Sequence, residues 1–193
     1  RKIAIVTGGG NGIGRGIAER LAVEGAIVTV TDQNLAAGKA VADAVDTIQF
    51  LEHDVRIAAD WAKVMDSVTQ QHGRLDILIN NAGILATESS QDVENTSLNQ
   101  WQAVNAVNSE GVFLGCQHGI EAMKATGGSI VNLSSIAALM ATPHLFAYGA
   151  SKAAVRQLTK TVAVHCGRKR YRIRCNSVHP GVIQTSMGDQ VMA

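Results

Sequence analysis

The residues with the clearest chemical potential are a tyrosine and a lysine four positions apart, Tyr148 and Lys152. On a helix, positions i and i+4 share one face, so the lysine ammonium can lie beside the phenol. A free tyrosine has a pKa of about 10, and a neighbouring cation favours the phenolate. The spacing therefore predicts a general acid and base for a hydroxyl or carbonyl group, the alternative being an ordinary surface pair.

Two serines, Ser134 and Ser135, directly follow an apolar run. A hydroxyl at this place could hydrogen-bond the oxygen of a substrate, or it could cap a helix. The turn is not a GxSxG nucleophile elbow, and it has no nearby histidine or aspartate in that arrangement. Hydrolase chemistry is therefore poorly supported.

A glycine-rich loop, TGGGNGIG at 7–14, lies between a predicted strand and a predicted helix. Its glycines allow a tight turn, the close approach of a pyrophosphate and close packing of the helix on the strand, and the free N–H groups of the helix start then face the phosphates. Because the strand and helix supply the confirming context, the loop predicts a nucleotide site rather than a tight turn alone. The predicted binding residues in it are Gly8, Asn11, Gly12, Ile13 and Gly14.

Two carboxylates end the next two predicted strands. Asp32 lies 18 residues after Gly14; it could accept hydrogen bonds from both ribose hydroxyls and would repel a 2′-phosphate, or it could cap the following helix. Asp54, followed by Val55, could accept from an adenine amino group or cap a turn. Asp32 predicts NAD rather than NADP, and neither Asn11 nor Gln33 provides a cation for a 2′-phosphate.

Two further turns follow strands at the same expected edge of the sheet. An Asn-Asn-Ala-Gly segment offers small residues for backbone contacts to a ribose, or is a plain turn, and a Pro-Gly turn leads to two residues that could lie beside a cofactor. The cofactor-binding residues predicted there are Asn81, Ala82, Gly83, Pro180, Gly181, Ile183 and Thr185.

The elements that position these residues alternate along the chain. Apolar runs predict strands over 2–7, 26–31, 48–53, 75–80, 129–133 and 172–178, and helical patterns predict helices over 14–24, 35–44, 61–72, 101–123 and 147–166. This order predicts an α/β fold with a single doubly wound parallel sheet of Rossmann type, flanked by helices on both faces. Ligands bind such sheets outside the carboxyl ends of the strands. No linker interrupts the pattern, so we expect one NAD-binding domain over 1–193.

Composition excludes several other classes of protein. Hydrophobic residues make up 46% and charged residues 17%, and the net charge is +1. This argues against a disordered chain and a general nucleic-acid binder, so we expect no nucleic-acid partner. No apolar run is long enough to span a membrane. Three separated cysteines and six histidines without HxxxH spacing predict no disulfide, no metal and a cytoplasmic location.

Together these segments resemble the short-chain dehydrogenase/reductase family in its NAD-dependent branch, and within it bacterial secondary-alcohol and hydroxysteroid dehydrogenases. The resemblance rests on TGGGNGIG at 7–14, NNAG at 80–83, the segment 101–108, Ser135 thirteen residues before Tyr148, YGASK at 148–152 and NSVHPG at 176–181. It covers essentially the whole chain.

The resemblance implies a role for each catalytic position. Tyr148 would give or take the proton, Lys152 would lower its pKa and bind the nicotinamide ribose, and Ser135 would orient the reacting oxygen. Asn108, which the pattern alone makes an ordinary helix residue, would hold a water in a proton relay. The resemblance also implies a homotetramer built from two long helices. Family members continue into a substrate lid and a seventh strand, so the chain is expected to be C-terminally incomplete.

The substrate is expected to be a hydrophobic secondary alcohol or its ketone, such as an alicyclic or steroid compound. The residues that would line its pocket are apolar: Leu85, Ile136, Ala137, Ala138, Leu139, Met140, Leu145 and Phe146. The alternatives are a 3-oxoacyl-carrier-protein reductase, which would use the basic run at 168–174 as a carrier patch, and a catalytically silent NAD-binding regulatory protein. The basic run has a simpler interpretation as a solvated helix end, because cations there favour the helix dipole.

Overall fold

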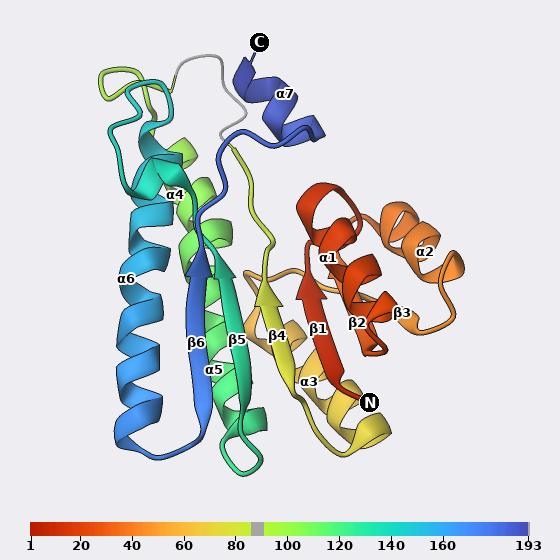
Figure 1. Cartoon of the computed structure of the whole chain (residues 1–193). Coiled ribbons are helices and arrows are strands. Elements are labelled where there is room, and N and C mark those ends of the chain that lie inside the picture. The colour runs from red at the N-terminus through yellow and green to blue at the C-terminus, as the bar shows by residue number, and fades with distance from the viewer. Residues whose placement is uncertain (86–90, 193) are drawn as a thin grey trace.

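The computed structural model describes residues 1–85 and 91–192, and in this part of the chain it has one six-stranded sheet between two layers of helices (Figure 1). The strands are β1 (Ile3–Thr7), β2 (Ile27–Asp32), β3 (Ile48–Glu52), β4 (Ile77–Asn80), β5 (Gly128–Leu133) and β6 (Ile173–Val178). Their order is β3-β2-β1-β4-β5-β6 and all neighbours are parallel. The predicted doubly wound α/β fold is confirmed.

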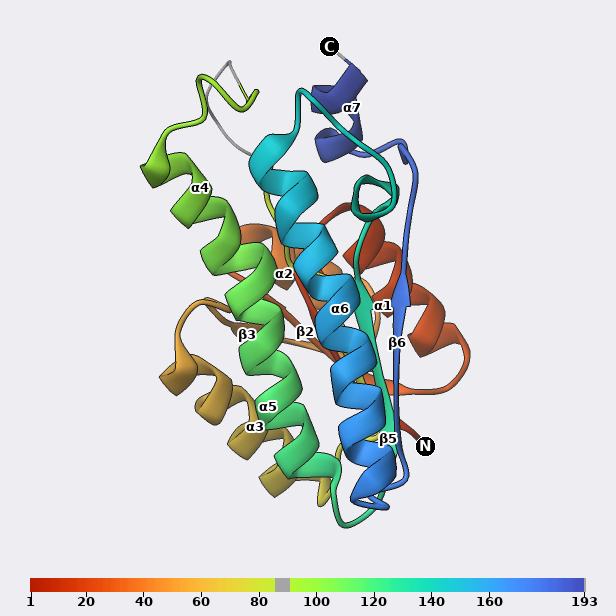
Figure 2. The ribbon, with the colours of Figure 1, turned by 90° about the vertical axis from the view of Figure 1, so that its left-hand side faces the viewer.

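Helices cover both faces of the sheet, as parallel strands require. They are α1 (Gly12–Val23), α2 (Leu35–Asp43), α3 (Ala58–His72), α4 (Leu98–Asn105), α5 (Gly111–Met123), α6 (Phe146–Arg168) and α7 (Ser186–Met192). Helices α1 and α2 lie on one face, and α3, α5 and α6 on the other, where α5 and α6 run side by side (Figure 2).

The alternating side chains of β1 explain why both faces must be covered. Ile3 and Ile5 are buried in the core cluster beneath α3, α5 and α6, whereas Ala4 and Val6 are buried in the cluster beneath α1 and α2. Successive residues of a strand point to opposite faces, so a uniformly apolar strand needs a helix layer on each side.

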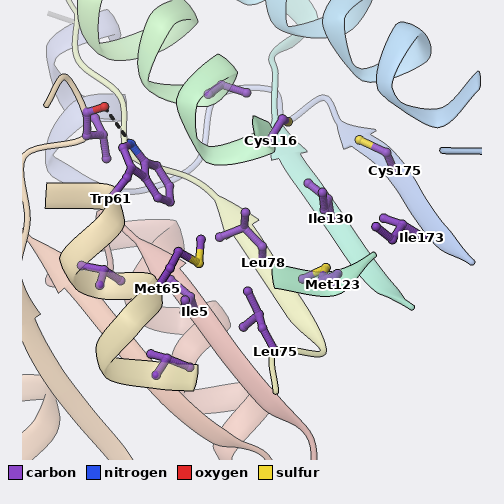
Figure 3. Packing of buried hydrophobic residues seen from close by; sticks show 14 of the residues in the cluster. Ile5, Trp61, Met65, Leu75, Leu78, Cys116, Met123, Ile130, Ile173 and Cys175 are labelled. Carbon is purple, nitrogen blue, oxygen red and sulfur yellow. Dashed lines mark hydrogen bonds between the residues drawn. The ribbon is translucent and has the colours of Figure 1, made fainter. Parts of the chain in front are cut away.

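Trp61 is the anchor of α3 in the larger core cluster. It is fully buried beside Met65 of the same helix, near Ile5 and Leu78 of the central strands (Figure 3). Its Nε1 donates a 2.9 Å hydrogen bond to the carbonyl oxygen of Val55, so the indole fixes the loop that follows β3. The packing of α3 thus holds one of the loops at the carboxyl edge of the sheet.

The prediction of one long helix over 101–123 is wrong in one respect, because a turn of another helix type interrupts the α-helix. Between α4 and α5 the chain forms a π-helical turn, η1 (Ala106–Glu110), which contains the buried Asn108. The sequence pattern predicts one regular helix here and does not anticipate this turn. Such turns occur frequently at functional sites.

Two short elements at the carboxyl edge were not predicted. A 3₁₀ turn, η2 (Ile136–Ala138), follows β5, and α7 follows β6 beyond the ends of the strands (Figure 1). Among the described residues, no helix is both long enough and apolar enough to cross a membrane. The cysteines Cys116, Cys166 and Cys175 are free and buried.

Candidate active site

A cavity of about 610 Å³ opens at the carboxyl ends of the strands, where the order of the sheet reverses between β1 and β4. The loops after all six strands, together with α7, contribute to it. Of the residues predicted to bind a cofactor, those that line the cavity are Gly8, Asn11, Gly12, Ile13, Gly14, Asp32, Val55, Asn81, Ala82, Gly83, Tyr148, Lys152, Pro180, Gly181, Ile183 and Thr185.

The glycine loop leaves donors free at the start of α1. Gly8 and Gly12 have φ values of 62° and 51°, which favour glycine, and a Cβ on Gly14 would overlap the carbonyl of Gly8. Asn11 is the N-cap of α1, but its side chain caps no N–H group. The first N–H groups of the helix therefore lack a side-chain acceptor beside the cavity, which fits the diphosphate of a dinucleotide.

Asp32 is tied to the glycine loop rather than to a helix end. One of its oxygens accepts from the N–H of Gly10 at 3.0 Å and the other from the N–H of Asn34 at 2.9 Å. Asn34, not Asp32, caps α2, because its side chain accepts from Ala37. Each carboxylate oxygen keeps further acceptor capacity, so the ribose hydroxyls of a dinucleotide fit here.

The structure does not bring Asp54 into the cavity. Both of its carboxylate oxygens accept from the guanidinium of Arg56, and one also accepts from the N–H of Arg56. These bonds hold the pKa of Asp54 below its usual value. The carboxylate therefore matches the turn-capping alternative, while its neighbour Val55 does line the cavity.

His53 lines the cavity although the sequence analysis passed over it. Its Nδ1 lies 3.0 Å from the hydroxyl of Thr31, and its ring meets Trp61 edge-on with centroids 4.5 Å apart. Burial lowers the pKa of His53 to about 4, against the opposing influence of nearby aspartates. The ring is therefore neutral at physiological pH. In the sequence, the one sign that His53 lines the cavity was its position at the end of an otherwise apolar strand.

The Asn-Ala-Gly turn after β4 clamps the glycine loop. The side-chain amide of Asn81 donates to the carbonyls of Thr7 and Gly8 at 2.9 and 3.0 Å. The hydroxyl of Thr7 in return accepts from the N–H groups of Asn81 and Ala82. The turn is thus more than a plain reversal, because its polar groups fix the shape of the loop that faces the cavity.

Asn108 is buried behind the cavity rather than in its lining. Its Oδ1 accepts from the N–H of Ile84 at 2.8 Å, and its Nδ2 donates to the carbonyl of Ile84 and to the hydroxyl of Ser151. A Cβ on Gly83 would lie 3.3 Å from both Asn108 Oδ1 and Lys152 Nζ. The π-turn therefore brings this amide to the lysine and links the loop after β4 to α6.

Lys152 is buried, and two hydrogen bonds join its residue to the end of β5. Its Nζ donates to the carbonyl of Leu133 at 2.8 Å, and the hydroxyl of Ser134 donates to the carbonyl of Lys152 at 2.8 Å. Burial lowers the pKa of Lys152 to about 8. The bonds fix one turn of α6, and with it the adjacent Tyr148, against the sheet.

Tyr148 lies beside Lys152 and Ser135, as the sequence predicted. The lysine Nζ is 5.6 Å from the centre of its ring, and the side chain of Ser135 lies beside the phenol. Burial nevertheless raises the pKa of Tyr148, and only the neighbouring hydroxyl of Ser135 opposes this effect. A lowering of this pKa by Lys152 stays a prediction, and burial lowers the pKa of the lysine itself to about 8.

The segment after β6 closes the cavity on the side of the glycine loop. A Cβ on Gly12 would lie 3.2 Å from the methyl group of Thr185, so the start of α1 and this segment are in close contact. The unpredicted α7 adds Ser186, Met187 and Gly188 to the lining.

The predicted apolar wall is present in part. Leu85, Ile136, Ala137, Met140 and Leu145 line the cavity, whereas the other three predicted residues do not. Phe146 instead packs on Trp101, with ring centroids 5.6 Å apart, and Leu139 is largely exposed. In the described part of the chain, no group of three or more His, Cys, Asp or Glu side chains could hold a metal ion.

Comparison with known proteins agrees with this geometry. A family model described as short chain dehydrogenase matches residues 2–193. A 3-beta-hydroxysteroid dehydrogenase of Comamonas testosteroni is 43% identical over 187 residues, which cover 96% of this chain and 72% of that protein. An NADP-dependent (R)-specific alcohol dehydrogenase of Lentilactobacillus kefiri is 41% identical, over 98% of this chain and 76% of the relative.

Solved structures show the same arrangement of strands and helices. The crystal structure of a 3-ketoacyl-(acyl-carrier-protein) reductase from Brucella melitensis, complexed with NADH, matches with a TM-score of 0.91 and 29% identity. The match covers 97% of this chain and 78% of that one. A dinucleotide-binding loop, a Tyr-Lys pair beside it and these likenesses along nearly the whole sequence lead to one conclusion: the chain belongs to the short chain dehydrogenase family and is an oxidoreductase that uses a nicotinamide cofactor.

Proposed function

We propose that the protein interconverts a hydrophobic secondary alcohol, such as an alicyclic or steroid alcohol, and its ketone, with NAD as the cofactor. The observation that carries this proposal is the meeting of Ser135, Tyr148 and Lys152 with the glycine loop and Asp32 in one cavity. The family and the hydroxysteroid and alcohol dehydrogenases among its relatives support the reaction class.

In this proposal each polar group of the site has a distinct task. The bound nicotinamide supplies or accepts the hydride. Tyr148 gives a proton to the carbonyl oxygen or takes one from the hydroxyl, and its raised pKa keeps the phenol protonated at neutral pH, ready to donate. Ser135 has one hydroxyl hydrogen, which it gives to the reacting oxygen when substrate is bound and to the phenol when no substrate is bound.

Lys152 and Asn108 act behind the tyrosine. Lys152 holds α6 on β5 through Leu133 and lies near enough to bind the nicotinamide ribose. Asn108, whose Oδ1 lies on the same side of Gly83 as the lysine Nζ, would hold a water that passes a proton onward.

The apolar lining supports a hydrophobic substrate. Its side chains on the β5 and β6 sides include Ile136, Met140, Leu145, Val182 and Met187. Among the described lining residues the only formal charges are those of Asp32 and Lys152, both of which are assigned to the cofactor end. A carboxylate or phosphate on the substrate would therefore have no partner in this wall.

The position of the basic run argues against the carrier-protein alternative. Arg168, Lys169 and Arg170 lie at the far end of α6, and Tyr148 lies near its start. With a rise of about 1.5 Å per residue, about 30 Å separates them along the helix. A carrier docked on this run would be at the end of the molecule opposite the cavity.

We also propose a homo-oligomer, with a tetramer as the expected state, and a cytoplasmic location. The small residues Gly149 and Ser151 of α6 are buried in the chain's own fold. Helices α5 and α6 lie side by side (Figure 2) and expose Phe113 and Val164, which are 51% and 56% accessible. Light scattering of the full-length protein checks this: we expect a mass above that of one chain, and a monomer at micromolar concentration would contradict it.

A substrate panel tests the function. Steroid and alicyclic secondary alcohols are compared with polyols, and the corresponding ketones with 3-oxoacyl thioesters, using NAD(H) throughout. We expect the largest kcat/KM for the alicyclic or steroid compounds, because the wall is apolar. Preference for the acyl thioester would favour the carrier-protein reductase, and no turnover of any compound despite NAD binding would favour the regulatory alternative.

Cofactor preference is tested by removing the charge of Asp32. At an effective dielectric of 20, two unit charges 4 Å apart repel by about 4 kcal/mol, which disfavours a 2′-phosphate beside this carboxylate. Asp32→Asn keeps an acceptor for the neighbouring N–H groups and should narrow the preference for NAD over NADP by about 10- to 100-fold, measured as the ratio of kcat/KM values.

The matched control is Asp54→Asn, which removes a carboxylate that faces Arg56 and does not line the cavity. We expect it to leave the ratio nearly unchanged. A wild-type protein that already prefers NADP, or equal ratios for wild type and Asp32→Asn, would show that Asp32 only shapes the loop.

A further inference from the structure

His179, in the turn that follows β6, contacts the backbone of the serine in the active site. It is half-buried, with Nδ1 3.0 Å from the carbonyl oxygen of Ser135 and Nε2 3.0 Å from the hydroxyl of Ser177. Neither the sequence motifs nor the proposed mechanism gives this side chain a task.

The two partners determine how the neutral ring carries its proton. A carbonyl oxygen can only accept, so Nδ1 carries the hydrogen and donates it to Ser135. Nε2 is then the acceptor and receives the hydroxyl hydrogen of Ser177. Ser177 thereby holds the ring in the tautomer that can bond to Ser135.

The hydrogen bond from His179 adds a side-chain tether between two backbone bonds. The N–H of Ser134 donates to Val178 at 2.8 Å, and the N–H of Ile136 donates to Pro180 at 3.0 Å. Pro180 has no N–H of its own, so the backbone cannot offer a donor at that position. The imidazole adds a side-chain donor to the carbonyl oxygen of Ser135, which also accepts from the N–H of Ala138 at 3.0 Å.

The peptide of Ser135 controls where its hydroxyl points. The Oγ accepts from the N–H of Ala137 at 3.1 Å, which leaves the hydroxyl hydrogen free for the phenol of Tyr148. The hydrogen bonds from His179 and Ala138 to its carbonyl oxygen and from Ala137 to its Oγ together fix the backbone and the side chain of Ser135.

We propose that His179 is a positioning residue, which orients the hydroxyl of Ser135 toward Tyr148 by holding the Ser135 carbonyl. The effect of His179 on turnover rests on the proposed function of Ser135 and Tyr148. Its effect on the pKa of the Tyr148 phenol does not depend on that function. The proposal can therefore be tested without a substrate.

The first experiment follows the ionisation of Tyr148 by NMR of ring-labelled tyrosine in the full-length protein. The tyrosines of the given sequence are Tyr148 and Tyr171, so Tyr171→Phe removes the second of them, and the signal that Tyr148→Phe removes is that of Tyr148. In this background, both Ser135→Ala and His179→Ala should raise the pKa of the phenol, because the phenolate loses a donor. His179→Asn should restore the wild-type value, since its amide nitrogen is as many bonds from the backbone as Nδ1 is.

An unchanged phenol pKa in a folded His179→Ala protein would overturn the proposal. So would an unchanged pKa in Ser135→Ala, because the hydrogen bond that His179 is said to orient would then be absent. Thermal unfolding of each variant identifies a general loss of structure, and the rescue by His179→Asn separates the lost donor from lost packing.

The second experiment measures turnover. His179→Ala should lower kcat about five- to tenfold, the usual effect of one neutral hydrogen bond, with unchanged affinity for NADH. In a Ser135→Ala background it should cause no further loss, because the two residues act in series. His165→Ala, at the far end of α6, is the control. If His179→Ala lowers kcat by the same factor with and without Ser135→Ala, the positioning role is contradicted. If the wild-type protein shows no turnover, the proposed function is contradicted, and the titration of the phenol then decides the role of His179.

Discussion

The structure of the site depends on one buried charge, the ammonium of Lys152. A buried ammonium needs a partner, and here the carbonyl of Leu133 at the end of β5 is the acceptor that it finds. The hydroxyl of Ser134 returns a bond to the backbone of the same lysine. These two bonds fix the first turns of α6 relative to the strand end, and Tyr148, one turn earlier, takes its position from them.

Two neighbouring features surround the buried ammonium of Lys152. Gly83 leaves room beside the Nζ, and the π-turn carries the amide of Asn108 into the same space. Because burial raises the pKa of Tyr148 and lowers that of Lys152 to about 8, both groups lose ionic character together. Burial thus disfavours the charged forms of both groups, the phenolate and the ammonium.

The sequence could predict the fold and most of the cavity because its signals were local. An apolar strand followed by a glycine loop, or Tyr148 and Lys152 at helical spacing, needs no distant contact to be recognised. The same local logic failed where one particular side-chain contact or backbone turn decides the outcome. Asp54 lies at a strand end like Asp32, but the adjacent Arg56 takes its carboxylate. The π-turn at 106–110 was not predicted from the apolar pattern of the helix, and the tautomer of His179 depends on Ser135, 44 residues away.

The central claim is that Tyr148 carries the proton while the glycine loop and Asp32 bind the cofactor independently of it. Turnover of Tyr148→Phe, with NADH affinity measured on the same protein, tests it most directly. The phenyl ring keeps the shape of the side chain but has no proton to exchange. The account predicts that kcat falls by about 100- to 10,000-fold while NADH binds with nearly wild-type affinity. A Tyr148→Phe protein that retains most of the wild-type rate would contradict it.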